Sequence, residues 1–160
     1  QLEPLIVGGG QERGMRSGTI NAPLIAGMAQ AVKIELSSRK ETEQKIIKLS
    51  EILMQRLFDS LDGIKINGSI ESRIADNLNL YISGIKTDEL LYACDLNGLC
   101  ISAGSACAAG TIQDSHVIKA IGRNKGGASA RITLSKYTTA EEIEFAAETI
   151  IAAVNKLRSK

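Results

Sequence analysis

The sequence predicts an α+β fold in which helices pack on a mostly antiparallel sheet of three to four strands. Two observations lead to this prediction. Apolar residues recur at helical spacing in the first third of the chain and again near its end, and between these segments short stretches alternate apolar and polar residues with the period of a strand. Turn sequences such as Asp62-Gly63 separate the alternating stretches.

The first third of the chain predicts two successive helices. Asn21 is a suitable N-cap, and apolar residues from Ile25 to Leu36 follow it at helical spacing. The polar run at 37–40 indicates a break between the helices. A second, longer helix is expected from about residue 41 to residue 61, with an apolar stripe made of Ile46, Leu49, Leu53 and Leu57.

The middle of the chain predicts two strands and a short helix. Residues 64–66 and 77–82 alternate apolar and polar side chains and are expected to be strands. Thr87 is placed to cap a helix that runs through Asn97, and Gly98 suits the C-terminal end of that helix.

Two short elements are expected next. Residues 99–101 are predicted to form a brief strand. Residues 115–121 are predicted to form a short helix that Asp114 caps and Gly122 ends.

The last part of the chain predicts a strand and a long helix. Residues 130–135 alternate as a strand, which places Arg131 on the face opposite Ile132. A capping-box pattern then marks the start of the final helix, formed by Thr138 or Thr139 with Glu141 or Glu142.

The composition restricts the class of protein. The chain has 160 residues, with 44% apolar and 23% charged residues, as is ordinary for a globular domain. A net charge of +1 provides no basic surface, so nucleic acid is not an expected partner. No apolar run is long enough for a membrane span and no signal peptide opens the chain, so a cytoplasmic protein without membrane contact is expected. The first residue is Gln1 rather than Met, which predicts a processed, excised or truncated product.

The cysteines and the histidine do not predict a metal site. Cys94, Cys100 and Cys107 match no zinc spacing, and His116 is the sole histidine. Cys94 and Cys100 stand among apolar residues and are expected to behave as small core hydrophobes. His116 is expected to be a surface or packing residue.

The stretch Ile101–Gly110 singles out Cys107. Nine of its ten residues are Ser, Ala, Gly or Cys, so it offers little side-chain area for packing and a permissive backbone. Composition alone leaves two interpretations open: a loop that presents a reactive thiol, or a flexible linker with an incidental cysteine.

The glycine-rich start of the chain also has two interpretations. Gly8, Gly9 and Gly10 precede Arg13, Arg16, Ser17 and Thr19, and these residues together supply bare amides, guanidinium groups and hydroxyls. That is the chemistry of an anion-binding segment, although the spacing is neither that of a Walker A loop nor that of a dinucleotide turn. The alternative is a glycine-rich surface turn.

Taken together, the motifs resemble the C-terminal part of pyridoxal-phosphate-dependent cysteine desulfurases of the nitrogen-fixation and iron–sulfur-cluster type, in the class V aminotransferase group. The resemblance rests on GGGQERGMRSGT at 8–19, ISAGSACAAG at 101–110, DSHVIKAIG at 114–122 and ARITLSKYTTAEEIE at 130–144. It implies the small C-terminal domain of a fold-type I enzyme at 23–160, which carries a mobile cysteine loop at 101–112. Residues 1–22 would be the tail of the large cofactor domain.

The resemblance also implies roles for three residues. Cys107 matches the nucleophile that takes sulfur from L-cysteine as a persulfide and releases L-alanine. Arg131 matches the arginine that binds the substrate carboxylate, and Thr19 the threonine that reaches the cofactor phosphate of the partner subunit in a homodimer. The family's Schiff-base lysine has no counterpart among these 160 residues, so the chain alone is expected to be inactive and to lack bound pyridoxal phosphate.

The resemblance leaves two alternatives open. A selenocysteine lyase would share the fold, and a non-catalytic sulfur-relay or binding module would use Cys107 only to pass sulfur onward. In the desulfurase reading, the expected partners are a second subunit, L-cysteine, and a sulfur-acceptor or iron–sulfur scaffold protein.

Overall fold

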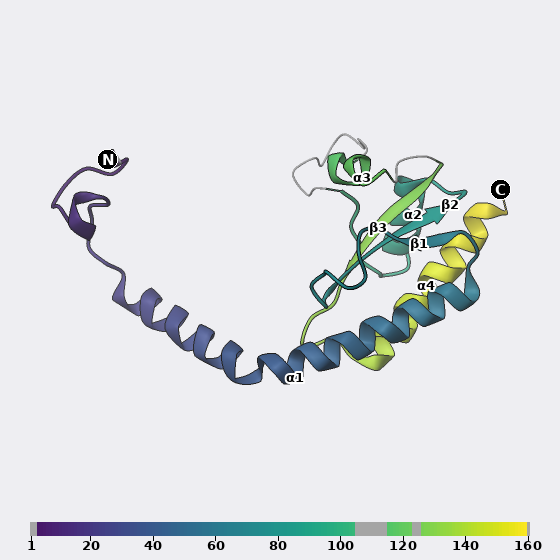
Figure 1. The fold of residues 1–160 in the computed structure, drawn as a ribbon, viewed down its shortest axis with the longest axis horizontal. Coiled ribbons are helices and arrows are strands. Elements are labelled where there is room, and N and C mark those ends of the chain that lie inside the picture. Colours follow the sequence, from purple (N-terminus) through teal and green to yellow (C-terminus); the bar gives the residue numbers. More distant parts are fainter. Residues whose placement is uncertain (1–2, 105–114, 123–125, 160) are drawn as a thin grey trace. The chain divides into compact units, whose positions relative to one another are not determined.

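The computed structural model describes residues 3–104, 115–122 and 126–159 (Figure 1). They form two compact units, Gln1–Lys40 and Glu41–Lys160. The elements in chain order are a 3-10 turn η1 (Glu12–Gly14), α1 (Ala22–Ser60), β1 (Ile64–Ile66), β2 (Asn77–Ser83), α2 (Thr87–Asp95), α3 (His116–Ala120), β3 (Gly127–Thr133) and α4 (Ala140–Arg158). This α+β architecture confirms the predicted fold class.

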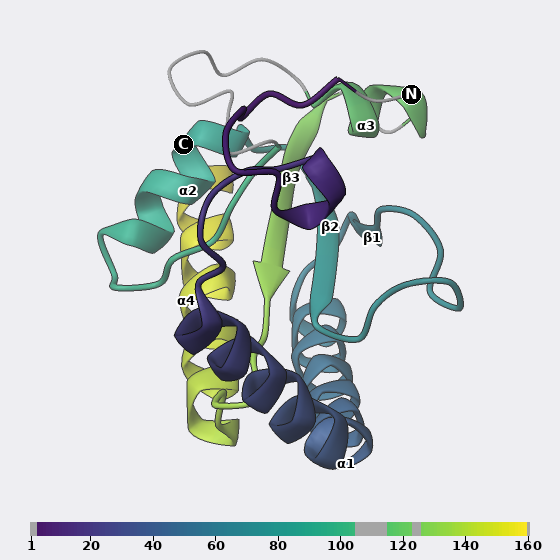
Figure 2. The same cartoon turned by 90° about the vertical axis from the view of Figure 1, so that its left-hand side faces the viewer.

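The sheet belongs to the second unit and is antiparallel, with the strand order β1-β2-β3. Ile64 pairs with Ile82, and Leu80 pairs with Ala130, so apolar residues from all three strands lie on one face. The C-terminal half of α1 and the whole of α4 cover that face, while α2 packs against α4 and β3 (Figure 1, Figure 2). The opposite face of the sheet is therefore left to the alternate, mostly polar residues of β2 and β3.

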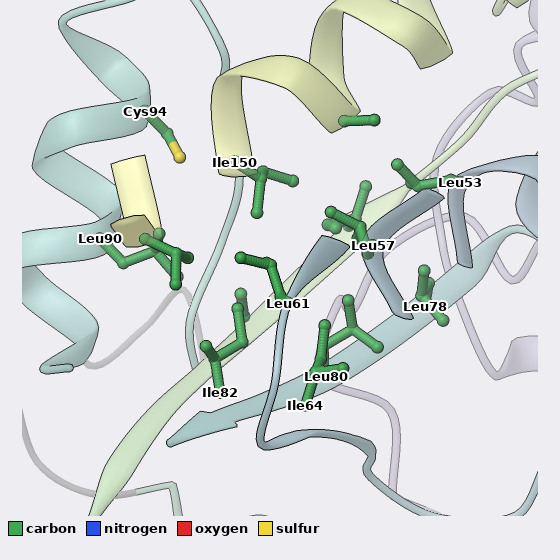
Figure 3. Close-up of a cluster of buried hydrophobic side chains, with 14 of the residues drawn as sticks. Leu53, Leu57, Leu61, Ile64, Leu78, Leu80, Ile82, Leu90, Cys94 and Ile150 are labelled. Atoms are coloured by element: carbon green, nitrogen blue, oxygen red, sulfur yellow. The ribbon is translucent and has the colours of Figure 1, made fainter. Parts of the chain in front are cut away.

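The core lies between the apolar face and the helices, as Figure 3 shows. Its largest fully buried side chains come from α1, β2, α2 and α4: Leu53, Leu57, Leu78, Leu80, Ile82, Leu90, Cys94, Ile150 and Val154. The predicted stripe of α1 is buried as expected. Period-two burial in β2 and β3 confirms the alternation from which these strands were predicted.

The break predicted at residues 37–40 is wrong, because α1 continues through it as one helix. The two serines do not terminate the helix because their hydroxyls donate to the carbonyl of Ile34, at 2.7 Å from Ser37 and 3.2 Å from Ser38. Serine can bond in this way to the preceding turn and remain helical. Neither glycine nor proline occurs in the segment to stop the helix.

Helix α2 differs from the prediction at both ends. Thr87 does not cap it: its Oγ1 accepts a hydrogen bond from the Ser129 N–H at 3.1 Å, which ties the start of α2 to β3. The helix ends at Asp95 rather than at Asn97. Gly98 has the positive φ (+79°) that suits a glycine just beyond a helix.

The starts of the other three α-helices have side-chain caps. At α1, the predicted Asn21 accepts through its Oδ1 from the Leu24 N–H at 3.2 Å. Ser115 caps α3, since its Oγ accepts from the Ile118 N–H at 3.5 Å, whereas Asp114 lies outside the described residues. Thr139 and Glu142 form the predicted capping box of α4. In that box the Thr139 hydroxyl accepts from the Glu142 N–H at 3.3 Å, and the Glu142 carboxylate accepts from the Thr139 N–H at 2.9 Å.

Arg158 joins the end of α4 to two turns of the sheet. Its Nε and NH2 donate to the Ser83 carbonyl at 3.2 and 2.9 Å, and NH2 also donates to the Asp62 carbonyl at 2.7 Å. Gly63 lies beside this contact with a φ of +66°, and a Cβ there would collide with the Ser83 hydroxyl. The guanidinium therefore holds together the ends of α4, α1 and β2.

Candidate functional site

Arg131 lies in the middle of β3, on the face of the sheet opposite the core. Ala130 and Ile132 on either side of it are buried, whereas Arg131 is half-buried, as the alternation predicts. Asn79 of β2 is its cross-strand neighbour. The predicted guanidinium is therefore on the polar face of the sheet, where it can meet a ligand without disturbing the core.

The segment that leads to Cys107 runs beside the outer edge of β3. The Arg131 N–H donates to the Ser102 carbonyl at 2.6 Å, and the Ser102 N–H donates to the Arg131 carbonyl at 3.0 Å. This pair forms a single isolated bridge at Ser102, so the strand predicted at 99–101 is wrong. Among the described residues the pairing stops at Ser102, and Gly104 turns the chain with a φ of +66° two residues later.

The side chain of Arg131 makes a third bond to the same segment. Its NH1 donates to the Gly104 carbonyl at 3.3 Å. Cys107 is three residues further along the sequence and lies outside the described residues. The structure thus brings Arg131 together with the base of the segment that carries Cys107.

A buried amide cluster supports the neighbours of Arg131, and it was not predicted from the sequence. Asn67 is 4% exposed, and its Nδ2 donates to Asn79 Oδ1 at 2.9 Å and to Ser129 Oγ at 3.4 Å. Arg73 NH2 donates to the Asn67 carbonyl at 2.9 Å. These contacts join the β1–β2 connection to β3, which carries Arg131, and to the neighbouring strand β2, and only the tertiary fold reveals them.

The two described cysteines differ from each other. Cys94 is fully buried in the core, and burial raises the pKa of its thiol to about 11, so it is a poor nucleophile. Cys100 is exposed, and the prediction that it is a core residue is wrong. Leu99 and Ile101 pack against the core, and the side chain between them therefore faces solvent.

In the glycine-rich segment, several backbone groups are bonded within the segment itself. The Ser17 hydroxyl accepts from the Gly10 N–H at 3.4 Å, and Gln11 Oε1 accepts from the Gly18 N–H at 3.0 Å. Arg16 NH1 donates to the Ser17 carbonyl at 2.9 Å. Thr19 follows with an exposed side chain, so its predicted phosphate contact stays a prediction.

Neither a metal site nor a membrane span is found in the described parts of the chain. No group of three His, Cys, Asp or Glu side chains in residues 3–104, 115–122 and 126–159 could hold a metal ion. His116 is exposed, as expected. Among the described helices, none is long and apolar enough to cross a membrane.

Comparison with known proteins identifies the family. The family model for class-V aminotransferases matches residues 2–145, and the chain therefore belongs to this family. It is 39% identical to a cysteine desulfurase IscS of Ehrlichia chaffeensis and 37% identical to one of Pseudomonas aeruginosa, in both cases over 99% of the chain. It spans only 38% and 39% of the length of those two proteins.

A solved structure gives the same result for the fold. The X-ray structure of a NifS-like protein from Rickettsia africae superimposes with a TM-score of 0.80 and 30% identity, covering 97% of this chain and 41% of that protein. The chain is thus homologous to a portion of the cysteine desulfurases, as the sequence motifs predicted.

The class-V family uses pyridoxal phosphate, but the described residues do not by themselves form a site for it. An imine requires a lysine whose amino group loses its proton readily, as happens in an enclosed or strongly perturbed environment. Every lysine in the described ranges is exposed to solvent: Lys33, Lys40, Lys45, Lys48, Lys65, Lys86, Lys119, Lys136 and Lys156. These residues therefore do not fit the carbonyl end of the cofactor.

Proposed function

We propose that this chain is part of a cysteine desulfurase, the part that carries the sulfur-accepting thiol and the arginine for the substrate carboxylate. The observation that carries the proposal is the 39% identity to a cysteine desulfurase over 99% of the chain. Arg131 supports it, since this guanidinium lies on the polar face of the sheet next to the segment that leads to Cys107.

In the proposed reaction, Arg131 binds the carboxylate of L-cysteine and Cys107 takes its sulfur atom. The carbon–sulfur bond of L-cysteine breaks, a sulfur–sulfur bond to Cys107 forms, and L-alanine leaves with a proton in place of the sulfur. Carbon is reduced while sulfur is oxidised, so no outside oxidant is required. Pyridoxal phosphate, when bound, would supply the electron sink for this cleavage, and residues other than those described would hold it.

Thr19 and the partners complete the proposal. Thr19 would contact the cofactor phosphate of a second subunit in a homodimer, which agrees with its exposed hydroxyl beside Gly18. The Cys107 persulfide would be passed to a sulfur-acceptor or iron–sulfur scaffold protein in the cytoplasm. The 160-residue chain alone would form no L-alanine.

The test is a chimera in which this chain replaces the matching portion of the Ehrlichia chaffeensis desulfurase. We expect the chimera, supplied with pyridoxal phosphate, to release L-alanine from L-cysteine, and Cys107→Ser to abolish that release. Cys100→Ser is the matched control, because Cys100 is an exposed thiol just before the same segment and should be dispensable. Full activity in Cys107→Ser would refute the assignment, and faster turnover of selenocysteine than of cysteine would favour a selenocysteine lyase.

A further inference from the structure

We propose that the backbone carbonyl of Gly104 positions the Arg131 guanidinium for the substrate carboxylate. It would thereby couple carboxylate binding to the base of the segment that carries Cys107. This inference rests on the proposed function, since it concerns the same site. It adds a positioning group that no side-chain motif could indicate, because the group is a main-chain oxygen.

Within the described residues, the guanidinium of Arg131 is bonded along one edge only. NH1 donates to the Gly104 carbonyl, whereas the structure records no hydrogen bond from Nε or NH2 to any of the described residues. Nε and NH2 form the edge of the guanidinium that can offer a carboxylate two parallel hydrogen bonds. One edge is therefore held by Gly104, while no residue of the described ranges bonds to the other edge, which is the one we assign to the carboxylate.

The carbonyl is itself held in place by local structure. Two backbone hydrogen bonds between Ser102 and Arg131 fix the chain two residues before Gly104. Gly104 then adopts a φ of +66°, a conformation that glycine accepts without strain. Hence the same residue that donates from its side chain also anchors, through its backbone, the segment that presents the acceptor.

We expect carboxylate binding and the Arg131–Gly104 hydrogen bond to strengthen each other. A free arginine side chain must lose considerable rotamer freedom to bind a carboxylate, and the bond to Gly104 removes part of that cost in advance. Coupling between two sites is reciprocal, so a bound carboxylate must stabilise the Arg131–Gly104 contact by the same factor. If the carboxylate instead took NH1, the two partners would compete and each would weaken the other.

Three glycine variants separate the carbonyl's role from a general effect of substitution. In Gly104→Ala the left-handed φ becomes unfavourable, although a Cβ would meet Ser115 only at an ordinary 3.8 Å, so the carbonyl should turn away from Arg131. Gly104→Asn is the rescue variant, because asparagine tolerates this conformation. Gly98→Ala is the matched control: it has a φ of +79° and open space around it, and no contact with Arg131 is recorded for it.

The experiment is an NMR titration of the 160-residue chain with L-alanine, which carries the carboxylate and amino group of the proposed product. The resonance of the Arg131 side-chain Nε–H, assigned by its loss in Arg131→Lys, reports binding. We expect Gly104→Ala to weaken L-alanine binding about tenfold, the effect of one charge-assisted hydrogen bond. Gly104→Asn and Gly98→Ala should stay within about twofold of the wild-type chain, since neither loses that bond.

A second readout needs no ligand. The heteronuclear NOE of the Arg131 Nε–H should fall in Gly104→Ala and should be retained in Gly98→Ala, with circular dichroism showing that both variants are folded. The proposal is overturned if Gly104→Ala binds L-alanine like the wild-type chain. It is also overturned if L-alanine lowers the order of Arg131, or if the wild-type Arg131 resonance does not respond to L-alanine.

These outcomes are separable from the test of the proposed function. An L-alanine response that depends on Gly104, in a chimera that releases no L-alanine from L-cysteine, would refute the desulfurase assignment and leave the positioning role intact. If the chimera is active but the Gly104→Ala chain binds L-alanine as tightly as the wild-type chain, the positioning role is refuted and the desulfurase assignment stands.

Discussion

Replacing Arg158 should measurably destabilise the second unit, because this side chain satisfies two carbonyls at the junction of three elements. It donates to the carbonyls of Ser83 and Asp62 at distances of 2.7 to 3.2 Å. The Ser83 contact is half-buried and the Asp62 contact is exposed, so losing the charged donor should cost about 1 kcal/mol at Ser83 and less at Asp62, and Arg158→Ala should lower the free energy of unfolding by about 1.5 kcal/mol. Arg158→Lys keeps the charge but lacks the planar guanidinium that reaches both carbonyls, so it should lower the free energy of unfolding by about 1 kcal/mol.

Urea denaturation followed by circular dichroism measures this effect, with the midpoint and the slope fitted separately. Lys156→Ala is the matched control, since Lys156 is an exposed cation at the same end of α4 and should change the free energy by less than about 0.5 kcal/mol. A free energy of unfolding for Arg158→Ala equal to that of Lys156→Ala would refute the reasoning. It would show that water satisfies the two carbonyls as well as the guanidinium does.

Two further predictions concern Cys94 and the cap of α4. The pKa of Cys94 is raised by burial from 9.0 to about 11, so the folded state holds this proton more tightly than the unfolded state does. Stability should therefore fall as the pH rises from about 9 to about 11, and Cys94→Ala should reduce that fall when urea midpoints are compared across pH. Iodoacetamide at about pH 8, below the raised pKa, should label Cys100 and spare Cys94, and equal labelling rates would contradict the assigned burial. Thr139→Ala should cost about 1 kcal/mol in thermal unfolding, because it removes the hydroxyl that accepts from the Glu142 N–H, whereas Gln55→Ala, an exposed change on α1, should cost less.

The elements that the sequence predicted correctly depend on local periodicity. Alternation placed Arg131 opposite Ile132 in β3, and the Thr139–Glu142 pattern located the start of α4. Both signals involve neighbours within a few residues, where side-chain chemistry and backbone geometry are closely linked. The family resemblance came from motifs of the same local kind.

The failed predictions depend on choices that local chemistry leaves open. Serines favour helix ends, yet Ser37 and Ser38 can also bond back to the preceding turn, and the structure takes that second option. Cys100 stands among apolar residues in sequence but faces solvent, because the chain direction there is set by the Ser102 bridge to Arg131, in a strand distant in the sequence. No short window of sequence contains that information.

At the candidate site, too, local features were predicted and long-range contacts were not. The sequence predicted that Arg131 lies in a strand, but it did not predict its hydrogen-bond partner. Gly104 contributes only a backbone carbonyl, and every residue has one. The buried amide of Asn67 was not predicted, and its bonds to Asn79 and Ser129 link three separate stretches of chain. Long-range polar contacts of this kind become visible only once the fold is known.

The contacts along β3 also bear on aggregation. Sheet edges with unpaired N–H and C=O groups can recruit strands from other molecules. In this sheet one edge strand, β1, has only three residues with the exposed Lys65 in its centre. The other edge, on β3, has its Ser129 N–H bonded to Thr87 and both backbone groups of Arg131 bonded to Ser102. The pairing of Ser102 with Arg131 therefore also leaves this part of β3 with few groups for an intruding strand to pair with.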